Sequence, residues 1–403
     1  MRNATVLGRA ALAVALLAPA ACSDFLDVTN PGPIADDALN GREAMPGLVV
    51  GMAADLSAAV SQVSIWSVLW GDDLRHSGTL GAPTIFTQGI IAPEDVGPVW
   101  NDMHRARWVA EDGIERMQDV LGSDYSTSEL AAEANVYAGY ANRILGENVC
   151  DAVFDGGPAE PYTVHFTRAE EYFTQAVTLA QAAGSTTLQR AALAGRAQVR
   201  AALGDWTGAA TDAAVLPVDF RFDAIFSENT GREENGWYGV TISRGEYTVW
   251  GSEWYSNPDP RAPWEAALTS SGDTAVAANG YTLWLKQQKF TSNADDIPLA
   301  KGTEMLLIRA EAALRAGDVT GAMAFINEGR AAQDMEPVTA TTPAEAWPIL
   351  HRERGADMWL EGRRFWDTRR WFEETGDAHL DWLNGRDKCV PVSREEVLSN
   401  PNF

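Results

Sequence analysis

Two short segments, far apart in the chain, repeat one pattern that limits the fold more than any other feature of the sequence. They are Gly204-Asp205-Trp206-x-x-Ala209 and Gly317-Asp318-Val319-x-x-Ala322. In both, a glycine turn separates two Ala-rich stretches whose apolar residues recur with helical spacing. Small residues before each turn, such as Ala197 and Ala201, allow two helices to approach closely. The pattern therefore predicts tightly packed helix pairs.

Both turns match the centre of a tetratricopeptide repeat, in which each helix pair buries its apolar face against the next pair. We expect a mainly α fold, with a helical-repeat scaffold over about residues 128–218 and 303–376. Residues 64–98 and 219–301 differ in composition, because Gly, Pro, Ser and Asn are frequent there, and they are expected to form loop-rich regions. The scaffold is therefore predicted to be short and interrupted.

The amino-terminal residues have the three-part pattern of a secretory signal peptide. Met1–Arg9 is basic, Ala10–Ala18 is apolar, and small residues follow as far as residue 21. The next residue, Cys22, stands where bacterial lipoproteins carry their lipid, so we expect it to be lipidated and to anchor the chain to a membrane. The alternative is an ordinary secretory signal with an incidental cysteine, because the leucine usual three positions earlier is absent.

Two further cysteines, Cys150 and Cys389, remain after Cys22. In an exported protein an even remainder favours a disulfide bond, so we expect these two residues to be linked. The alternative is two separate buried thiols.

Charge and motif content exclude several classes of function. A net charge of −25 argues against nucleic acid as a partner, because phosphate binding needs clustered Lys and Arg. The sequence has no Gly-x-Ser-x-Gly, His-Glu-x-x-His or P-loop motif, and its 5 His residues lack metal-ligand spacing. Acidic doublets such as Asp72-Asp73 could supply a glycosidase pair, but 56 acidic residues produce doublets by chance. We therefore expect no enzyme, cofactor or metal, with a loop-carboxylate Ca²⁺ site left as an alternative.

Four segments, in this order along the chain, carry a resemblance to one protein family. They are Cys22–Gly32, Ile297–Ala331, His351–Trp371 and Cys389–Asn402. They resemble the lipidated start, the late tetratricopeptide unit, the arginine-rich signature and the closing element of the SusD/RagB family of outer-membrane nutrient-uptake lipoproteins. Within the signature, Asp357 replaces a glutamate and Thr368 replaces a leucine.

The resemblance implies a SusD-like domain over residues 22–403 that follows a signal peptide at residues 1–21. It also implies a lipoprotein in the outer membrane that faces the cell exterior and captures a nutrient, commonly an oligosaccharide. Such a protein delivers its ligand to a TonB-dependent, SusC-like β-barrel transporter without catalysis. The alternative function is that of a surface helical-repeat protein that binds peptides or another protein.

A sugar presents a face of C–H bonds and a rim of hydroxyl groups, so its capture needs flat aromatic rings together with Asp, Glu, Asn, Arg or Gln. Two aromatic-rich stretches of the predicted loop regions offer both kinds of residue. The candidate ligand-binding residues are Trp66, Trp70, Asp73, Trp237, Tyr238, Arg244, Trp250, Glu253, Trp254 and Tyr255. The alternative is that these rings only seal the loops onto the domain.

The aromatic and arginine residues of the signature segment are expected to have structural roles. Trp359, Trp366 and Trp371 are predicted to lie in the core. The arginines are predicted to pair with nearby acidic residues rather than with a ligand; they are Arg352, Arg354, Arg363 and Arg369.

Overall fold

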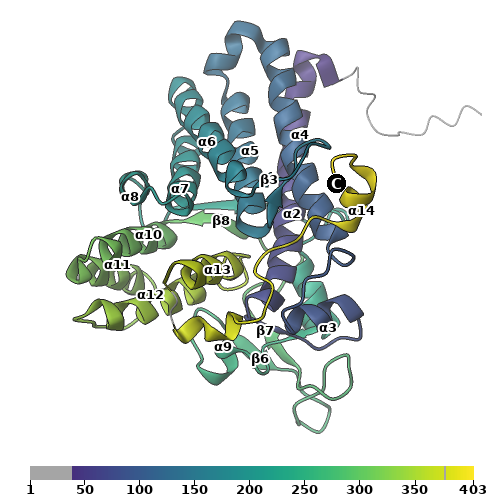
Figure 1. Ribbon diagram of the computed structural model, residues 1–403, viewed down its shortest axis with the longest axis vertical. Coiled ribbons are helices and arrows are strands. Elements are labelled where there is room, and N and C mark those ends of the chain that lie inside the picture. Colours follow the sequence, from purple (N-terminus) through teal and green to yellow (C-terminus); the bar gives the residue numbers. More distant parts are fainter. Residues whose placement is uncertain (1–38, 376–377) are drawn as a thin grey trace, which may run out of the picture. The chain divides into compact units, whose positions relative to one another are not determined.

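Helices make up most of the computed structural model, which describes residues 39–375 and 378–403 (Figure 1). The predicted signal peptide and the lipidation site Cys22 lie outside the described residues. The chain divides into a unit that ends at Ala44, in which only a short 3₁₀ helix, η2 (Arg42–Ala44), is described, and a unit that spans Met45–Phe403. The predicted mainly α fold is confirmed.

The second unit contains long helices joined by short turns and interrupted by irregular segments. The α-helices are α2 (Met45–Trp70), α3 (Gly81–Thr87), α4 (Gly97–Leu121), α5 (Glu129–Asn148), α6 (Thr163–Ala183), α7 (Thr186–Ala202), α8 (Trp206–Ala213), α9 (Glu253–Ser256), α10 (Gly302–Arg315), α11 (Val319–Ala331), α12 (Pro343–Asp357), α13 (Arg364–Thr375) and α14 (Arg394–Ser399). The short 3₁₀ or π turns are η3 (Gly122–Thr127), η4 (Tyr238–Ser243) and η5 (Ala378–Leu383).

The described strands are short and pair as two-stranded antiparallel sheets. The pairs are β1 (Arg75–His76) with β5 (Tyr247–Thr248), β2 (Asp151–Ala152) with β3 (Glu160–Pro161), β4 (Arg221–Ala224) with β8 (Ile297–Lys301), and β6 (Trp264–Ala266) with β7 (Leu285–Gln287).

The two repeated turns have the same local structure, which explains the sequence signature. Gly204 and Gly317 adopt left-handed backbone angles, with φ of 82° and 80°, and this conformation ends the first helix of each pair. The next residue caps the second helix, because the carboxylate of Asp205 accepts a hydrogen bond from the Gly208 backbone N–H at 2.9 Å. Asp318 does the same in the second repeat, at 2.8 Å. The glycine therefore allows the chain to turn, and the aspartate caps the start of the next helix.

The two repeats are neighbours in space although the sequence between them is long. Helix α8 of the first repeat packs directly against α10 of the second. The inserted segment leaves and rejoins the scaffold through the antiparallel pair β4–β8. At its return point, a Cβ atom on Gly302 would lie 2.1 Å from the Pro217 carbonyl oxygen, so only glycine fits there. The insertion thus leaves the stack of helices continuous.

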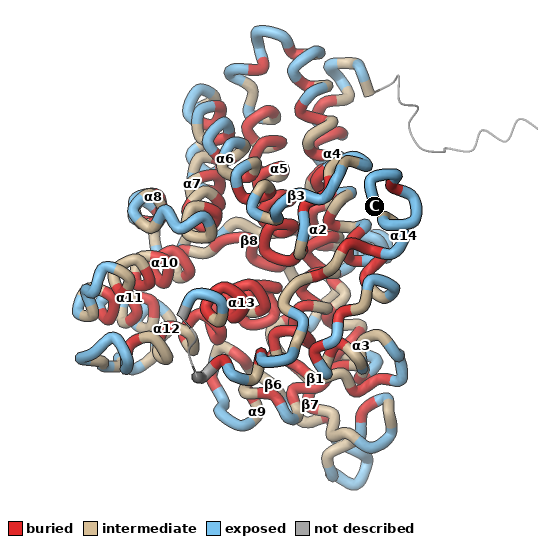
Figure 2. Tube along the Cα trace, viewed as in Figure 1, coloured by how far each residue is buried: buried red, intermediate tan, exposed pale blue. Residues whose placement is uncertain are grey.

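Helix α2 is a central element of the core. It contacts both α4 and α5, and most of its residues are buried (Figure 2). The helical stretch from Arg42 to Trp70 is long and apolar enough to cross a membrane by length and composition, yet its most apolar window is 61% buried within the fold. The sequence analysis placed Trp66 and Trp70 in a loop-rich region. This is wrong, because α2 continues to Trp70 and both residues lie on its last turns.

A disulfide bond joins Cys150 to Cys389, with their Cα atoms 5.0 Å apart. Backbone hydrogen bonds lie on both sides of it, from Val390 N–H to the Asn148 carbonyl at 2.7 Å and from Cys150 N–H to the Val390 carbonyl at 2.9 Å. The carboxyl-terminal segment that leads to α14 is therefore fastened to the end of α5.

The signature segment forms two helices with a sharp break between them. Leu360 and Gly362 have positive φ angles of 62° and 76°, which separate α12 from α13. The three tryptophans of the segment are buried, as predicted. Arg354 donates to Asp367 at 2.9 Å, and Arg363 donates to Glu304 at 2.8 Å, so the predicted structural role of these two arginines is confirmed.

Candidate functional site

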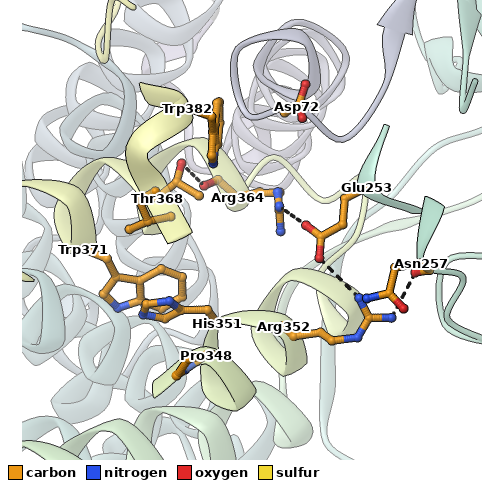
Figure 3. A pocket seen from close by; sticks show the side chains of 11 residues that line it. Asp72, Glu253, Asn257, Pro348, His351, Arg352, Arg364, Thr368, Trp371 and Trp382 are labelled. Atoms are coloured by element: carbon orange, nitrogen blue, oxygen red, sulfur yellow. Dashed lines mark hydrogen bonds and ion pairs between the residues drawn. The ribbon is translucent and has the colours of Figure 1, made fainter. Parts of the chain in front are cut away.

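A hollow of about 480 Å³ is lined by two groups of elements (Figure 3). Helices α12 and α13 and the turn η5 form one side, and α9 and the turn after α2 form the other. This volume lies in the range that is typical of small-molecule binding sites. The lining residues are Asp72, Glu253, Asn257, Pro348, His351, Arg352, Arg364, Thr368, Trp371, Leu380 and Trp382. We call this hollow the α12–α13 pocket.

One wall of the α12–α13 pocket is made of rings and apolar side chains. The imidazole of His351 stacks on the indole of Trp371, with ring centroids 3.9 Å apart and planes inclined by 28°. Trp371 is buried, whereas Trp382 is half-buried and leaves part of its surface accessible. This wall can therefore pack against the apolar face of a ligand.

The opposite wall is charged and internally paired. Figure 3 shows the carboxylate of Glu253 between two guanidinium groups. Arg352 donates to Glu253 Oε1 at 3.2 Å, and Arg364 donates to Glu253 Oε2. Arg364 also donates to the Gly71 carbonyl at 3.0 Å, which fixes it against the turn after α2. The wall thus offers both hydrogen-bond donors and hydrogen-bond acceptors, held in place by their contacts with one another.

Behind this wall lies the buried carboxylate of Asp73. The indole N–H of Trp254 donates to Asp73 Oδ1 at 2.7 Å, and the Arg364 guanidinium lies 3.3 Å away. Burial raises the pKa of Asp73 to about 7, against the opposing effects of Arg364 and the Trp254 N–H. Its neighbour Asp72 lines the pocket with a left-handed backbone (φ 65°) and pairs with Arg75 at 2.7 Å.

Asp73→Asn is expected to flatten the pH dependence of stability. The folded-state pKa of about 7 exceeds the ordinary value of 3.8, so between these values the folded protein binds a proton more tightly than the unfolded chain does. The free energy of unfolding therefore falls as pH rises through this range, and the uncharged Asn removes that part of the fall. Urea unfolding of the wild type and of Asp73→Asn from pH 4 to pH 8 measures this difference in the free energy of unfolding. Parallel profiles would show that Asp73 is already ionised throughout.

Four of the predicted ligand-binding residues are buried and are corrected to structural roles. Trp70, Asp73, Trp237 and Trp254 are at most 2% exposed. Trp237 donates its indole N–H to Ser64 Oγ at 3.0 Å and stacks on Phe290, which seals the inserted segment onto α2. The rings of this group fill the interior between α2 and the loops, so they present no face to a ligand.

The other predicted residues reach the surface, but of these only Glu253 lines the α12–α13 pocket. Trp250, Tyr255 and Trp264 form a group of half-buried rings, with centroids 4.4 Å and 5.8 Å apart. Glu253 and Tyr255 lie two residues apart on α9, so they point to different sides of this turn. Trp66 and Tyr238 are half-buried, and the exposed Arg244 pairs with Glu246 at 3.1 Å.

The sequence prediction missed the residues that converge on the pocket from the carboxyl-terminal third of the chain. His351 and Arg364 were not singled out, and Arg352 was assigned only to an acidic partner, which it has in Glu253. Trp382 lies in η5, and its signal in the sequence is a single tryptophan between the signature segment and the closing element. Within residues 39–375 and 378–403, no group of three or more His, Cys, Asp or Glu side chains is arranged to hold a metal ion.

Comparisons with known proteins agree on one family. Residues 207–390 match the model of the SusD family. The chain is similar in fold to a SusD-like carbohydrate binding protein from Bacteroides vulgatus, with 14% identity and a TM-score of 0.63 over 81% of this chain and 83% of that one. It is also similar to a SusD superfamily protein from Bacteroides thetaiotaomicron, with 14% identity and a TM-score of 0.67 over 90% and 97% of the two chains.

A third similar structure is a laminarin binding SusD-like protein, with 13% identity and a TM-score of 0.61 over 90% of this chain and 100% of that one. No curated protein matches the sequence. The resemblance of the sequence to the SusD/RagB family is therefore confirmed by the match over residues 207–390 and by the fold that the chain shares with these structures.

Proposed function

We propose that this chain binds an oligosaccharide in the α12–α13 pocket. The observation that carries the proposal is the convergence of a half-buried indole, Trp382, and a wall of paired guanidinium and carboxylate groups on one hollow of about 480 Å³. Two of the similar structures support the class of ligand, because one is named as carbohydrate binding and another as laminarin binding.

The proposed mode of binding follows from the chemistry of the two walls. A sugar ring places its C–H face on Trp382, while its hydroxyls accept from Arg352 and donate to Glu253. Besides the Glu253 that they share, Arg352 lies 3.8 Å from Asp259 and Arg364 lies 3.3 Å from Asp73, so carboxylates already surround both guanidinium groups and a neutral sugar suits the wall better than an acidic one. Affinity is expected to be micromolar to millimolar, which corresponds to about −8 to −4 kcal/mol.

We further propose that the ring group on the other side of α9 extends this site for longer chains. Trp250 and Tyr255 belong to the same short segment as Glu253, and both remain partly accessible. A long oligosaccharide that fills the pocket can continue over these rings. Trp66, Tyr238 and Arg244 remain candidates for more distant contacts.

At the level of the cell, the proposed function is nutrient capture without catalysis. The chain is proposed to be lipidated at Cys22, to be held in the outer membrane facing the exterior, and to deliver its ligand to a TonB-dependent, SusC-like β-barrel transporter. The amino-terminal pattern and the match of residues 207–390 to the SusD family model support this proposal.

Trp382→Ala is expected to lower oligosaccharide affinity at least tenfold, because truncation of a tryptophan that anchors a ligand costs about 2 kcal/mol. Isothermal titration against a panel of neutral oligosaccharides and a panel of peptides measures it. Tyr281→Ala is the matched control, because this ring is 80% exposed and does not line the pocket.

Three outcomes of this titration separate the alternatives. Loss of sugar binding in Trp382→Ala with an unchanged melting temperature supports the pocket. Loss in Trp250→Ala alone moves the site to the ring group. Binding of peptides and of no sugar favours the alternative function of a peptide-binding surface protein.

The transporter partner is tested separately. Affinity purification of the tagged full chain from detergent-solubilised outer membrane is expected to recover a large β-barrel protein, and Cys22→Ala is expected to release the chain into soluble fractions. Recovery of no such protein in several detergents, or membrane retention of Cys22→Ala, contradicts this part of the proposal.

A further inference from the structure

A second hollow, of about 290 Å³, lies between α4, the turn that follows β2, and α14. It shares no lining residue with the α12–α13 pocket. The residues that matter here are Arg105 and Trp108 from α4, Asp155 from the turn, and Glu396 from α14. We call this hollow the α4–α14 pocket.

Trp108 is the unusual feature of the α4–α14 pocket. The apolar spacing of α4 places it roughly on one stripe with Trp100 and Met103, which are 2% and 1% exposed. Trp108 itself is 49% exposed, so its indole contributes little to the core. A large ring that is held half in solvent beside a hollow is available to a ligand.

The carboxylate of Asp155 is fixed in place beside this ring. Asp155 has a left-handed backbone (φ 52°), and Arg107 donates to its Oδ1 at 2.7 Å. Two asparagines of the carboxyl-terminal segment hold the same turn. Asn400 donates to the Gly157 carbonyl at 2.8 Å and Asn402 donates to the Gly156 carbonyl at 2.7 Å. The position of Asp155 is therefore set before any ligand arrives.

The other two polar groups are anchored in the same way. Glu396 Oε1 accepts from Asn400 at 2.9 Å, and Arg105 pairs with Asp55 at 2.8 Å and with Asp102 at 3.1 Å. Within the described part of the chain, Asp155 Oδ2 and Glu396 Oε2 accept no hydrogen bond from protein. Two positioned acceptors thus remain open on the rim of the hollow.

We infer that the α4–α14 pocket is a second carbohydrate-binding site, in which a neutral sugar ring packs on Trp108 and donates hydroxyl hydrogen bonds to Asp155 and Glu396. Arg107 pairs with Asp155, and Arg105 pairs with Asp55 and Asp102, so carboxylates already meet both guanidinium charges, and the open carboxylate oxygens repel an anionic ligand. The inference rests on the proposed function only for the class of ligand, because the two pockets are separate.

Fluorine NMR of the full chain that carries 5-fluorotryptophan tests both pockets in one experiment. The chain contains 15 tryptophans, and the substitutions Trp108→Phe and Trp382→Phe assign the two signals that matter. The probes are laminarihexaose, maltohexaose, cellohexaose and xylohexaose, each titrated to 10 mM. Tyr281→Ala, which removes an exposed ring that lines neither pocket, is the control.

We expect at least one probe to shift the Trp108 signal saturably, both in the wild type and in Trp382→Ala. The control variant Tyr281→Ala is expected to show the same shift as the wild type. Absence of a Trp108 shift with all four probes overturns the second site, whatever happens at Trp382. A Trp108 shift that disappears in Trp382→Ala also overturns it, because the signal then reports binding at the other pocket. A Trp108 shift without a Trp382 shift supports the second site and counts against the proposed role of the α12–α13 pocket.

Discussion

Replacing Trp254 with alanine is expected to lower the free energy of unfolding by about 3–5 kcal/mol, the usual range for a buried tryptophan. The side chain is fully buried, and its N–H is hydrogen-bonded to Asp73 at 2.7 Å. The guanidinium groups of Arg352 and Arg364 lie over its ring, 5.6 Å and 5.3 Å from the centroid. Truncation therefore leaves a cavity, removes one hydrogen bond from the buried Asp73 carboxylate and removes the ring over which the two arginines lie. Chemical denaturation followed by circular dichroism measures the loss.

Two variants separate these contributions. Trp254→Phe keeps an aromatic ring and removes the N–H, so we expect the free energy of unfolding to fall by about 1–3 kcal/mol for the lost hydrogen bond to buried Asp73. Trp250→Ala removes a half-buried ring from the same segment, and a smaller loss than that of Trp254→Ala is expected. If Trp254→Ala is no less stable than the wild type but no longer binds ligand, the residue is a surface contact and its assignment to the interior is wrong.

Replacing Glu311 with alanine is expected to cost about 3–5 kcal/mol, because removing one partner leaves an uncompensated buried charge. Glu311 on α10 is 1% exposed and accepts two hydrogen bonds from Arg370 on α13, at 2.6 Å and 2.7 Å. It also accepts from the indole N–H of Trp371 at 3.1 Å. Since Trp371 lines the α12–α13 pocket, we also expect weaker ligand binding in this variant.

The pH range of this contribution follows from the pKa of Glu311. Burial alone raises it, but Arg370, Arg354 and Arg315 together outweigh burial and hold the pKa well below its usual value. The stabilisation is therefore complete at neutral pH and is lost only as the pH falls below the ordinary glutamate pKa.

Glu374→Ala is the matched control for Glu311→Ala. Glu374 also pairs with Arg315, but its side chain is 43% exposed, so solvent screens the pair and we expect a loss below about 1 kcal/mol. Equal losses in the two variants contradict the view that burial makes the Glu311 contacts important.

The helical scaffold could be predicted from the sequence because its signals are local. The Gly-Asp turns at 204–205 and 317–318 contain both the left-handed residue and the cap that the turn needs. The contact between α8 and α10 could not be predicted in this way, because it depends on β4 and β8, which lie at opposite ends of the insertion.

The binding residues were harder to predict because an aromatic ring in an irregular segment has the same local pattern whether it seals a loop or faces a ligand. Trp237 and Trp254 can be buried without an unsatisfied N–H because these groups donate to Ser64 and Asp73, which are 173 and 181 positions away in the sequence. The α12–α13 pocket likewise joins Asp72 to Trp382, from opposite ends of the chain. These contacts join distant segments, so no pattern within a single segment predicts them.

The most direct test of the proposed function is the crystallographic position of a bound oligosaccharide, using the sugar that binds most tightly in the titration. We expect a sugar ring against Trp382, with hydroxyls within hydrogen-bond distance of Arg352 and Glu253. Electron density for the sugar at another surface, with the space beside Trp382 filled only by water, would contradict the assignment of the α12–α13 pocket.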